Sequence, residues 1–149
     1  MKRIQNSTAV AFIFIWIGFV CSISFMEAWL KFRAPGMTLE LGLGVGKLVF
    51  GTLNKMEWIF AIIILLNLVI SRQNLLKGLN ILLLLSIVIV ALQSFWLLPA
   101  LFERANLHIE AQRVSSSSFA HYTYIILEVL KFIFLTVFGI SLLKKRRNI

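Results

Sequence analysis

Residues 79–98 read LNILLLLSIVIVALQSFWLL, an uninterrupted stretch without a charged side chain. An α-helix of about 20 residues is about 30 Å long, which matches the hydrocarbon thickness of a bilayer. Lipid cannot hydrogen-bond to the backbone, so a segment that crosses it must satisfy its own polar groups as a helix. This stretch therefore predicts a transmembrane helix, which Pro99 is expected to end.

Three further apolar runs flank this stretch, and together they predict one all-α membrane domain over residues 1–149, an integral membrane four-helix bundle. The first run follows Lys2 and Arg3 and also resembles a cleavable secretory signal. Its apolar character continues to Leu30, and three more spans follow, which favours a retained helix. The predicted helices cover about 9–30, 47–70, 79–98 and 121–143, with long connections at 31–46 and 99–120.

The composition agrees with this class. The chain of 149 residues is 60% hydrophobic and 14% charged, whereas soluble domains are about 45–50% apolar and about 25% charged. Its net charge of +9 is spread over helix ends and loops, without the basic face that nucleic acid requires. Nucleic acid is therefore not an expected partner, and membrane lipids are. Cys21 is the only cysteine, so no intramolecular disulfide can form.

The connection over 31–46 is rich in turn signals. Pro35-Gly36 indicates a turn, and the glycines that follow alternate with apolar residues, which favours an interfacial or re-entrant segment. The run from Gly42 to Lys47 resembles phosphate-binding loops, but its spacing departs from theirs and no strand precedes it. Close packing of Gly42 and Gly46 against another helix is the favoured interpretation.

The distribution of Lys and Arg predicts the topology. The termini and the short hinge between the second and third helices carry eight basic residues, against six near the two long connections. Basic residues near helix ends are retained on the cytoplasmic face. We therefore expect a multi-pass protein of the cell membrane with both termini cytoplasmic and both long connections outside. The basic residues on the cytoplasmic side are Lys2, Arg3, Arg72, Lys77 and 144–147.

The polar residues of the four helices converge in the predicted outer half. Ionisable residues at membrane depth are costly and often mark ligand sites or proton relays. Structural ion pairs, such as Glu128 with Lys131, and interhelical amide contacts are the alternative, and both interpretations stay open. The candidate ligand-binding residues are Glu27, Asn54, Glu57, Gln93, His121, Tyr124, Glu128 and Lys131.

Metal and cofactor signals are weak. The paired Glu-x-x-His motifs of di-iron bundles do not occur, and His108 and His121 are the only histidines. A single metal held by His121, Glu128 and Glu57 is geometrically conceivable, but no metal site is assigned. The predicted interfacial aromatic belt would also suit a quinone or lipid headgroup; its residues are Trp29, Trp58, Trp96, Tyr122 and Tyr124.

The order of these features resembles a small four-span membrane family of unknown function, typified by transmembrane protein 205. The segments that carry the resemblance are KFRAPG (31–36), GKLVFGTLNKMEW (46–58), WLLPALFERA (96–105) and SFAHYTY (118–124). A second likeness, to DoxX-like proteins, is carried by EAWLKF (27–32) and Glu57, and it implies a redox-associated or quinone-linked membrane subunit.

Three functional hypotheses follow. The favoured one is a non-enzymatic protein that binds a small ligand, lipid or ion at the polar cluster. The alternatives are a DoxX-like redox subunit and a purely structural assembly subunit. The expected partners are membrane lipids, together with further copies of the chain or another membrane protein. The sequence does not identify a cofactor.

Overall fold

The structure, a computed structural model, describes residues 7–76, 78–111 and 119–147, and the described residues contain no strand. Four helical spans account for most of them. Span 1 comprises α1 (Ser7–Val20), the π-helix η1 (Cys21–Glu27), α2 (Ala28–Leu30) and the 3-10 helix η2 (Lys31–Arg33). Span 2 is α3 (Leu39–Ile70). Span 3 comprises α4 (Asn80–Leu92), the π-helix η3 (Gln93–Leu97) and α5 (Leu98–Ala111), and span 4 is α6 (Phe119–Arg147).

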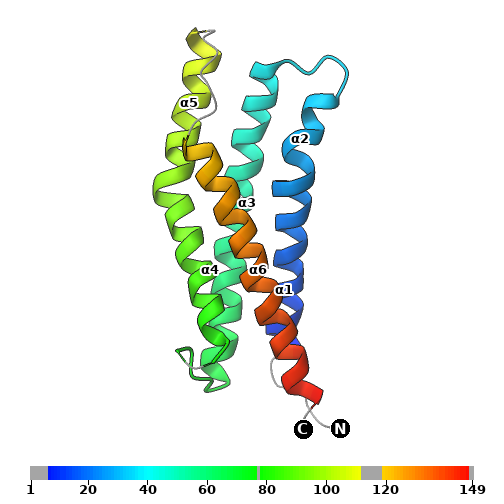
Figure 1. Ribbon diagram of the computed structural model, residues 1–149, viewed down its shortest axis with the longest axis vertical. Helices are drawn as coiled ribbons and strands as arrows, with labels where there is room; N and C mark the ends of the chain where they lie inside the picture. The colour runs from blue at the N-terminus through cyan, green and yellow to red at the C-terminus, as the bar shows by residue number, and fades with distance from the viewer. Residues whose placement is uncertain (1–6, 77, 112–118, 148–149) are drawn as a thin grey trace.

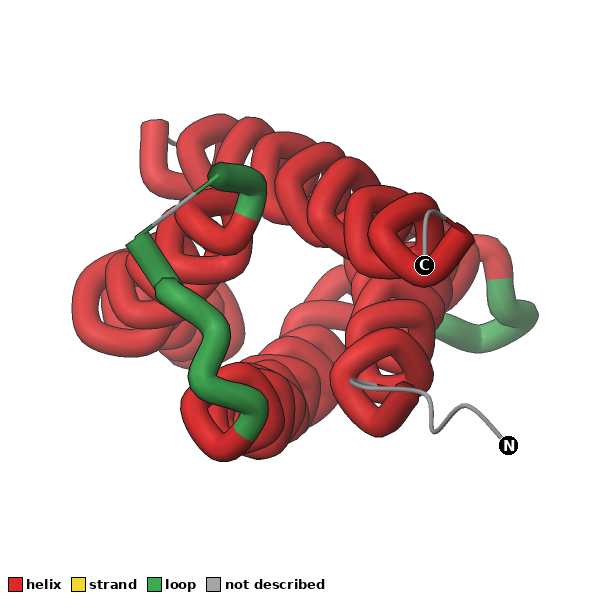
Figure 2. Tube along the Cα trace, turned by 90° about the horizontal axis from the view of Figure 1, so that it is seen from below, coloured by secondary structure: helices red, strands yellow, loops and turns green. Residues whose placement is uncertain are grey.

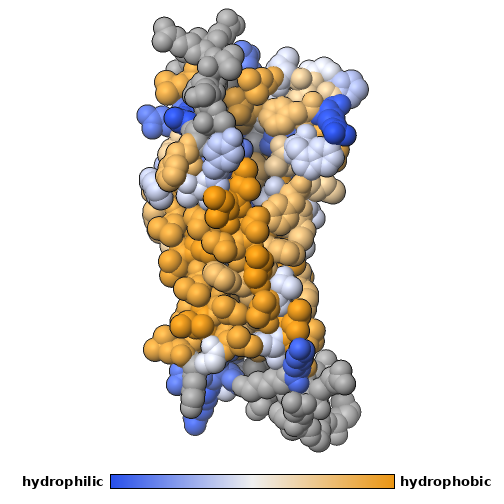
Figure 3. All heavy atoms as spheres, in the orientation of Figure 1, coloured by the Kyte–Doolittle hydropathy of each residue, from blue (hydrophilic) through white to orange (hydrophobic). Residues whose placement is uncertain are grey.

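Within the described residues, all four spans are long and apolar enough to cross a membrane. Figure 3 shows the corresponding surface, a broad apolar band with hydrophilic residues towards both ends. The predicted all-α four-helix bundle is thereby confirmed, and these helices indicate a multi-pass membrane protein.

The spans pack around a common axis, as the end-on view in Figure 2 shows. α6 packs against α1 and α4, while α3 packs against α1 and α5. The start of α1, the end of α6 and the connection that leaves α3 lie at one end of the bundle, here called the terminal end (Figure 1). The opposite end, with the connection between η2 and α3, is called the distal end.

An apolar core fills the half of the bundle near the terminal end. All four spans contribute to this terminal core, and its side chains are almost fully buried. In lipid such a core gains from dispersion contacts rather than from leaving water. Its largest members are Ile13, Trp16, Phe60, Ile64, Leu68, Leu83, Leu135 and Phe138.

The second span begins eight residues earlier than the sequence predicted, at Leu39 rather than near Lys47. The predicted interfacial or re-entrant segment over 31–46 is therefore wrong for its second half. Thr38 supplies the reason, because its hydroxyl oxygen accepts a hydrogen bond from the Leu41 N–H at 3.2 Å and caps the helix. Glu40 in the first turn adds favourable charge near the helix N-terminus.

The third span does not end at Pro99, and the predicted loop over 99–120 is helical as far as Ala111. The π-helix η3 ends at Leu97, two residues before the proline, and its wider turn lets the Leu98 N–H bond to the Gln93 carbonyl, five residues back. Proline disrupts an α-helix through its missing N–H and its clash with a carbonyl one turn earlier. The altered register of the π-turn explains why the helix continues.

The connection at the terminal end closes α3 in a Schellman arrangement. The Gln73 N–H bonds to the Leu68 carbonyl at 3.0 Å, and Arg72 adopts a left-handed conformation with φ 52°. Gly78 also has a positive φ, of 63°. Three basic residues counted for the topology, Lys2, Arg3 and Lys77, lie outside the described residues.

Candidate functional site

Five side chains from all four spans meet in a buried charge network: Trp16, Glu57, Gln93, Glu128 and Lys131. Gln93 and Lys131 have no exposed surface, and the two glutamates are each 1% exposed. Four of the predicted candidate residues are thus brought together. The predicted pairing of Glu128 with Lys131 is confirmed, with an Nζ to Oε1 distance of 2.7 Å.

Lys131 is the centre of the network. Its Nζ lies 2.5 Å from Glu57 Oε1, 2.7 Å from Glu128 Oε1 and 2.8 Å from Gln93 Oε1. An ammonium group has three donors and no acceptor, so these three oxygens use its full capacity. The Gln93 amide nitrogen also donates to Glu128 Oε1 at 2.7 Å. Lys131 therefore joins spans 2, 3 and 4 through a single nitrogen atom.

Trp16 is the member that sequence reasoning missed. Its indole N–H donates to Glu57 Oε1 at 3.0 Å from the middle of an apolar helix. A signal was present, because a buried indole N–H needs an acceptor. A tryptophan ten residues into an apolar span, far from the interfacial belt, indicates a polar partner on another span.

Asn54 belongs to a second, separate bridge between α3 and η3. Ser94 donates its hydroxyl to Asn54 Oδ1 at 2.8 Å, and the Trp58 indole N–H donates to Ser94 Oγ at 2.8 Å. This arrangement fits the interhelical role that was the alternative for Asn54. Trp96, by contrast, is exposed and takes no part.

Glu27 and His121 also lie outside the buried charge network. Glu27 pairs along its own span with Lys31 at 3.2 Å, one helical turn away. His121 is exposed near the start of α6, with its ring edge-on to Tyr122. Glu27, Asn54 and His121 are therefore not part of the buried charge network, and their role as ligand-binding candidates stays a prediction.

The depth of the network also differs from the prediction. Glu57 and Gln93 each lie thirteen residues from the terminal end of their span, which is about 20 Å along a helix. Because α3 and α5 extend farther at the distal end than predicted, the network lies nearer the middle of the helices. It marks the boundary between the terminal core and the distal half.

A pocket of about 230 Å³ opens in the distal half, and all four spans contribute to its wall. The wall is largely apolar and aromatic, and Lys31, Lys47 and His121 are the basic residues in it. The lining residues are Ala28, Lys31, Phe32, Gly42, Leu43, Gly46, Lys47, Phe50, Leu98, Leu101, Phe102, Ala105, His121 and Tyr124. We call this space the distal pocket.

Two glycines of α3 shape the pocket. A Cβ atom at Gly42 would lie 2.1 Å from the Phe32 ring, and one at Gly46 would lie 3.0 Å from Lys31 Nζ. The absence of these side chains lets η2 approach α3, as the sequence predicted for Gly42 and Gly46. Lys31 Nζ consequently lies 5.1 Å from the centroid of the Phe50 ring, within cation–π range.

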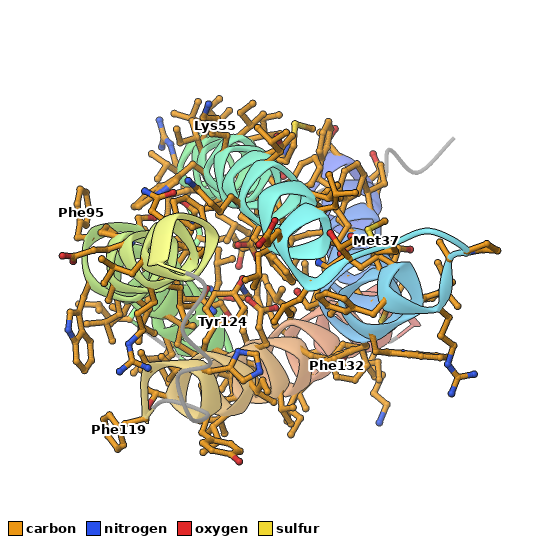
Figure 4. All side chains as sticks on the ribbon, turned by 90° about the horizontal axis from the view of Figure 1, so that it is seen from above. Met37, Lys55, Phe95, Phe119, Tyr124 and Phe132 are labelled. Atoms are coloured by element: carbon orange, nitrogen blue, oxygen red, sulfur yellow. The ribbon has the colours of Figure 1, made fainter. Side chains whose placement is uncertain are left out.

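Tyr124 joins the distal pocket to the buried charge network. It lines the pocket and packs edge-on against Phe50, with 5.7 Å between ring centroids. Its hydroxyl lies close to Ser24 and to Glu128, which is one helical turn farther along α6. Figure 4 shows Tyr124 in the interior of the bundle, whereas Lys55 and Phe95 point away from it. A molecule in the pocket would therefore be one side chain away from the network.

Among the described residues, no three His, Cys, Asp or Glu side chains are grouped so that they could hold a metal ion. The conceivable trio of His121, Glu128 and Glu57 is not assembled, since His121 is exposed and both glutamates are buried around Lys131.

No protein-family model, curated protein or solved structure matches the chain. The two resemblances drawn from the sequence stay predictions. Fold and site together define the class. The protein is a multi-pass four-helix membrane protein with a buried charge network near the middle of its helices and a pocket in its distal half.

Proposed function

We propose that this protein binds a small amphiphilic molecule in the distal pocket. The observation that carries the proposal is an apolar, aromatic pocket with ammonium groups in its wall, to which every span contributes. Pockets for drug-sized ligands are about 300–1,000 Å³. A volume of about 230 Å³ suits a smaller ligand or one end of a lipid.

The wall indicates the chemistry of the ligand. Phe32, Phe50 and Phe102 offer apolar contact for a hydrocarbon body. Lys47 donates to the neutral side-chain amide of Asn106, so that contact leaves its charge uncompensated. An ammonium donates hydrogen bonds and attracts anions. The favoured ligand therefore has an apolar body and an anionic or acceptor-rich head.

A matched pair of glycine variants tests the proposal. Gly46→Leu would place a side chain against Lys31 in the pocket, whereas a Cβ at Gly44 meets nothing within 4 Å. Both changes replace glycine by the same helix-forming residue. Binding of oleate, an anionic amphiphile, and of its neutral methyl ester would be measured by native mass spectrometry on detergent-purified protein.

We expect oleate to bind the unaltered protein and Gly44→Leu alike, and Gly46→Leu to bind about tenfold more weakly, a loss of about 1.4 kcal/mol. The methyl ester should bind more weakly than oleate, since it lacks the charge that Lys47 attracts. Equal oleate binding by Gly44→Leu and Gly46→Leu would refute the pocket as the site.

The proposed setting is the cell membrane, with both termini cytoplasmic and the distal pocket near the outer face. The excess of Lys and Arg at the termini and hinge supports this orientation. Reporter fusions at Asn74 and at the C-terminus should both report a cytoplasmic location. An external C-terminal reporter would reverse the orientation.

A structural role is the second candidate, favoured by the way in which Lys131 and its partners join all four spans. Under this alternative Glu57→Gln lowers the thermal stability and leaves oleate binding unchanged. Under the binding proposal Gly46→Leu weakens oleate binding about tenfold and leaves the stability near that of Gly44→Leu. The two variants therefore separate the candidates.

A further inference from the structure

The buried charge network is not electrically balanced. It contains two carboxylates, Glu57 and Glu128, and one ammonium, Lys131, and the charged groups that act on Glu57 are the other two. Gln93 and Trp16, from η3 and α1, complete the network with neutral groups. Fully ionised, these five side chains would bury one net negative charge between helices. Such a charge is very costly unless it is compensated.

One atom of the network has no partner. Glu128 Oε1 accepts hydrogen bonds from both Lys131 and Gln93, whereas Glu128 Oε2 is buried without a hydrogen bond. Glu57 Oε1 likewise takes two donors, the Trp16 indole and Lys131. Glu57 Oε2, however, is not among the buried oxygens that lack a hydrogen bond. A buried carboxylate oxygen without a hydrogen-bond donor is a position at which an additional positive charge would be favourable.

Tyr124 provides the neighbouring acceptor. Tyr124 lies four residues before Glu128 on α6, one helical turn away, and its hydroxyl is close to Glu128 and to Ser24 of η1. The Ser24 hydroxyl oxygen is likewise buried without a hydrogen-bond partner. Ser24 and Gln93 both lie in π-helical segments, which occur frequently at functional sites. The Tyr124 side chain also lines the distal pocket.

From these observations we propose that Glu128 Oε2 is the binding site for one exchangeable proton, reached from the distal pocket through the Tyr124 hydroxyl. The step is a relay: a hydronium ion in the pocket gives one proton to the Tyr124 oxygen and becomes water, while the phenolic O–H bond breaks and its proton bonds to Glu128 Oε2. Net transfer is one proton from the pocket to the carboxylate, and Tyr124 returns to its original state.

A proton fits this position better than a metal cation. Hard cations such as Ca²⁺ and Mg²⁺ are held by about six oxygen ligands. Within the described residues, no group of three or more potential metal-binding acids, histidines or cysteines exists. A proton needs one oxygen to bind and one acceptor nearby, and Glu128 and Tyr124 supply both. The proposal does not depend on ligand binding in the pocket.

Infrared spectroscopy of the full chain in lipid nanodiscs at neutral pH tests the site through the carbonyl band of a protonated carboxyl group. All six acidic residues are glutamates, so an introduced aspartate is recognisable by its different band position. We expect one protonated-carboxyl band that loses its intensity in Glu128→Gln and persists in Glu27→Gln. Glu128→Asp should move the band, whereas Glu57→Asp should leave its position unchanged.

Exchange kinetics test the route. After transfer to D₂O, the shift of the band should be about tenfold slower or more in Tyr124→Phe than in the unaltered protein, because the relay hydroxyl is gone. Tyr122→Phe is the matched control, since Tyr122 is exposed and does not line the pocket. It should exchange at the original rate, and the intensity of the band should be the same in both variants.

Three results would overturn the proposal. Absence of a protonated-carboxyl band at neutral pH would show that the network holds no extra proton. A band that moves in Glu57→Asp would place the proton on the other glutamate. Equal exchange rates in Tyr124→Phe and Tyr122→Phe would exclude the route through Tyr124. Each reading is made on ligand-free protein, so it is independent of the oleate experiment.

Discussion

The two halves of this bundle are built from the same four spans but are filled differently. Near the terminal end, buried side chains such as Ile64, Leu68 and Phe138 form one continuous apolar core. Near the distal end, a small cluster around Leu97, Leu98 and Tyr124 leaves a pocket between the spans. The buried charge network separates the two. The terminal half is closely packed, whereas the distal half contains the space that the proposed ligand would occupy.

The largest expected loss of stability comes from a substitution in the buried charge network, which separates the two halves. Lys131→Met removes the ammonium shared by Glu57 and Glu128 and leaves two buried carboxylates without it. Breaking a buried ion pair in this way costs about 3–5 kcal/mol. Thermal unfolding in detergent measures the loss. Lys144→Met, at an exposed position in the last turns of α6, is the control and should change little. Equal thermal stability of the two variants would show that the buried charge network does not stabilise the fold.

A comparison of two leucines tests the difference in packing between the halves. Leu68→Ala opens a cavity in the fully buried terminal core, whereas Leu101→Ala enlarges a pocket that already exists. The unfolded spans stay in detergent or lipid, so we expect mainly the cavity contribution, about 2 kcal/mol at Leu68 and under about 1 kcal/mol at Leu101. Unfolding of both variants in detergent provides the values. A larger loss at Leu101 would reverse the assignment of the two halves.

Two tryptophan variants test how much the Trp16 contact in the buried charge network contributes to stability. Trp16→Phe keeps most of the ring packing but removes the donor to Glu57 Oε1. A hydrogen bond to a charged group contributes about 1.5–3 kcal/mol. Trp29→Phe removes an indole donor as well, in this case one that bonds to the Phe25 carbonyl on the exposed surface, and should cost under about 0.5 kcal/mol. Similar losses in thermal unfolding would indicate that the Trp16 contact adds nothing to stability.

The smallest effect is expected at the terminal connection, far from both site regions. Arg72 has a φ of 52° at the end of α3, a conformation that glycine adopts without strain. Arg72→Gly should therefore raise the stability by about 0.5–1 kcal/mol and leave oleate binding unchanged. Arg72→Ala removes the same charge without relieving the backbone and is the control. A gain in Arg72→Ala equal to that in Arg72→Gly would point to charge rather than to conformation.

The sequence was sufficient for the class of fold, because runs of about 20 apolar residues have one structural solution in lipid. It also found four of the five network residues, since buried charges stand out against an apolar background. It missed Trp16 because an indole is apolar in a hydropathy pattern and polar only at one atom.

The helix ends were harder to predict for a local reason. The cap at Thr38 and the π-turn before Pro99 both depend on backbone hydrogen bonds that composition does not reveal. The distal pocket could not be predicted at all. It exists because Gly42 and Gly46 face Phe32 and Lys31 across two spans, and that register is set by tertiary packing.

The contrast between the two halves is tested most directly by the labelling of single cysteines with a water-soluble maleimide, in a Cys21→Ala background. Gly46→Cys and Ala105→Cys place the thiol in the distal pocket, and Ala61→Cys places it in the terminal core. We predict that both pocket positions react about tenfold faster or more than Ala61→Cys, because a packed position must open locally before it reacts. Equal reaction rates at the three positions would contradict a packed terminal half beneath an open distal half.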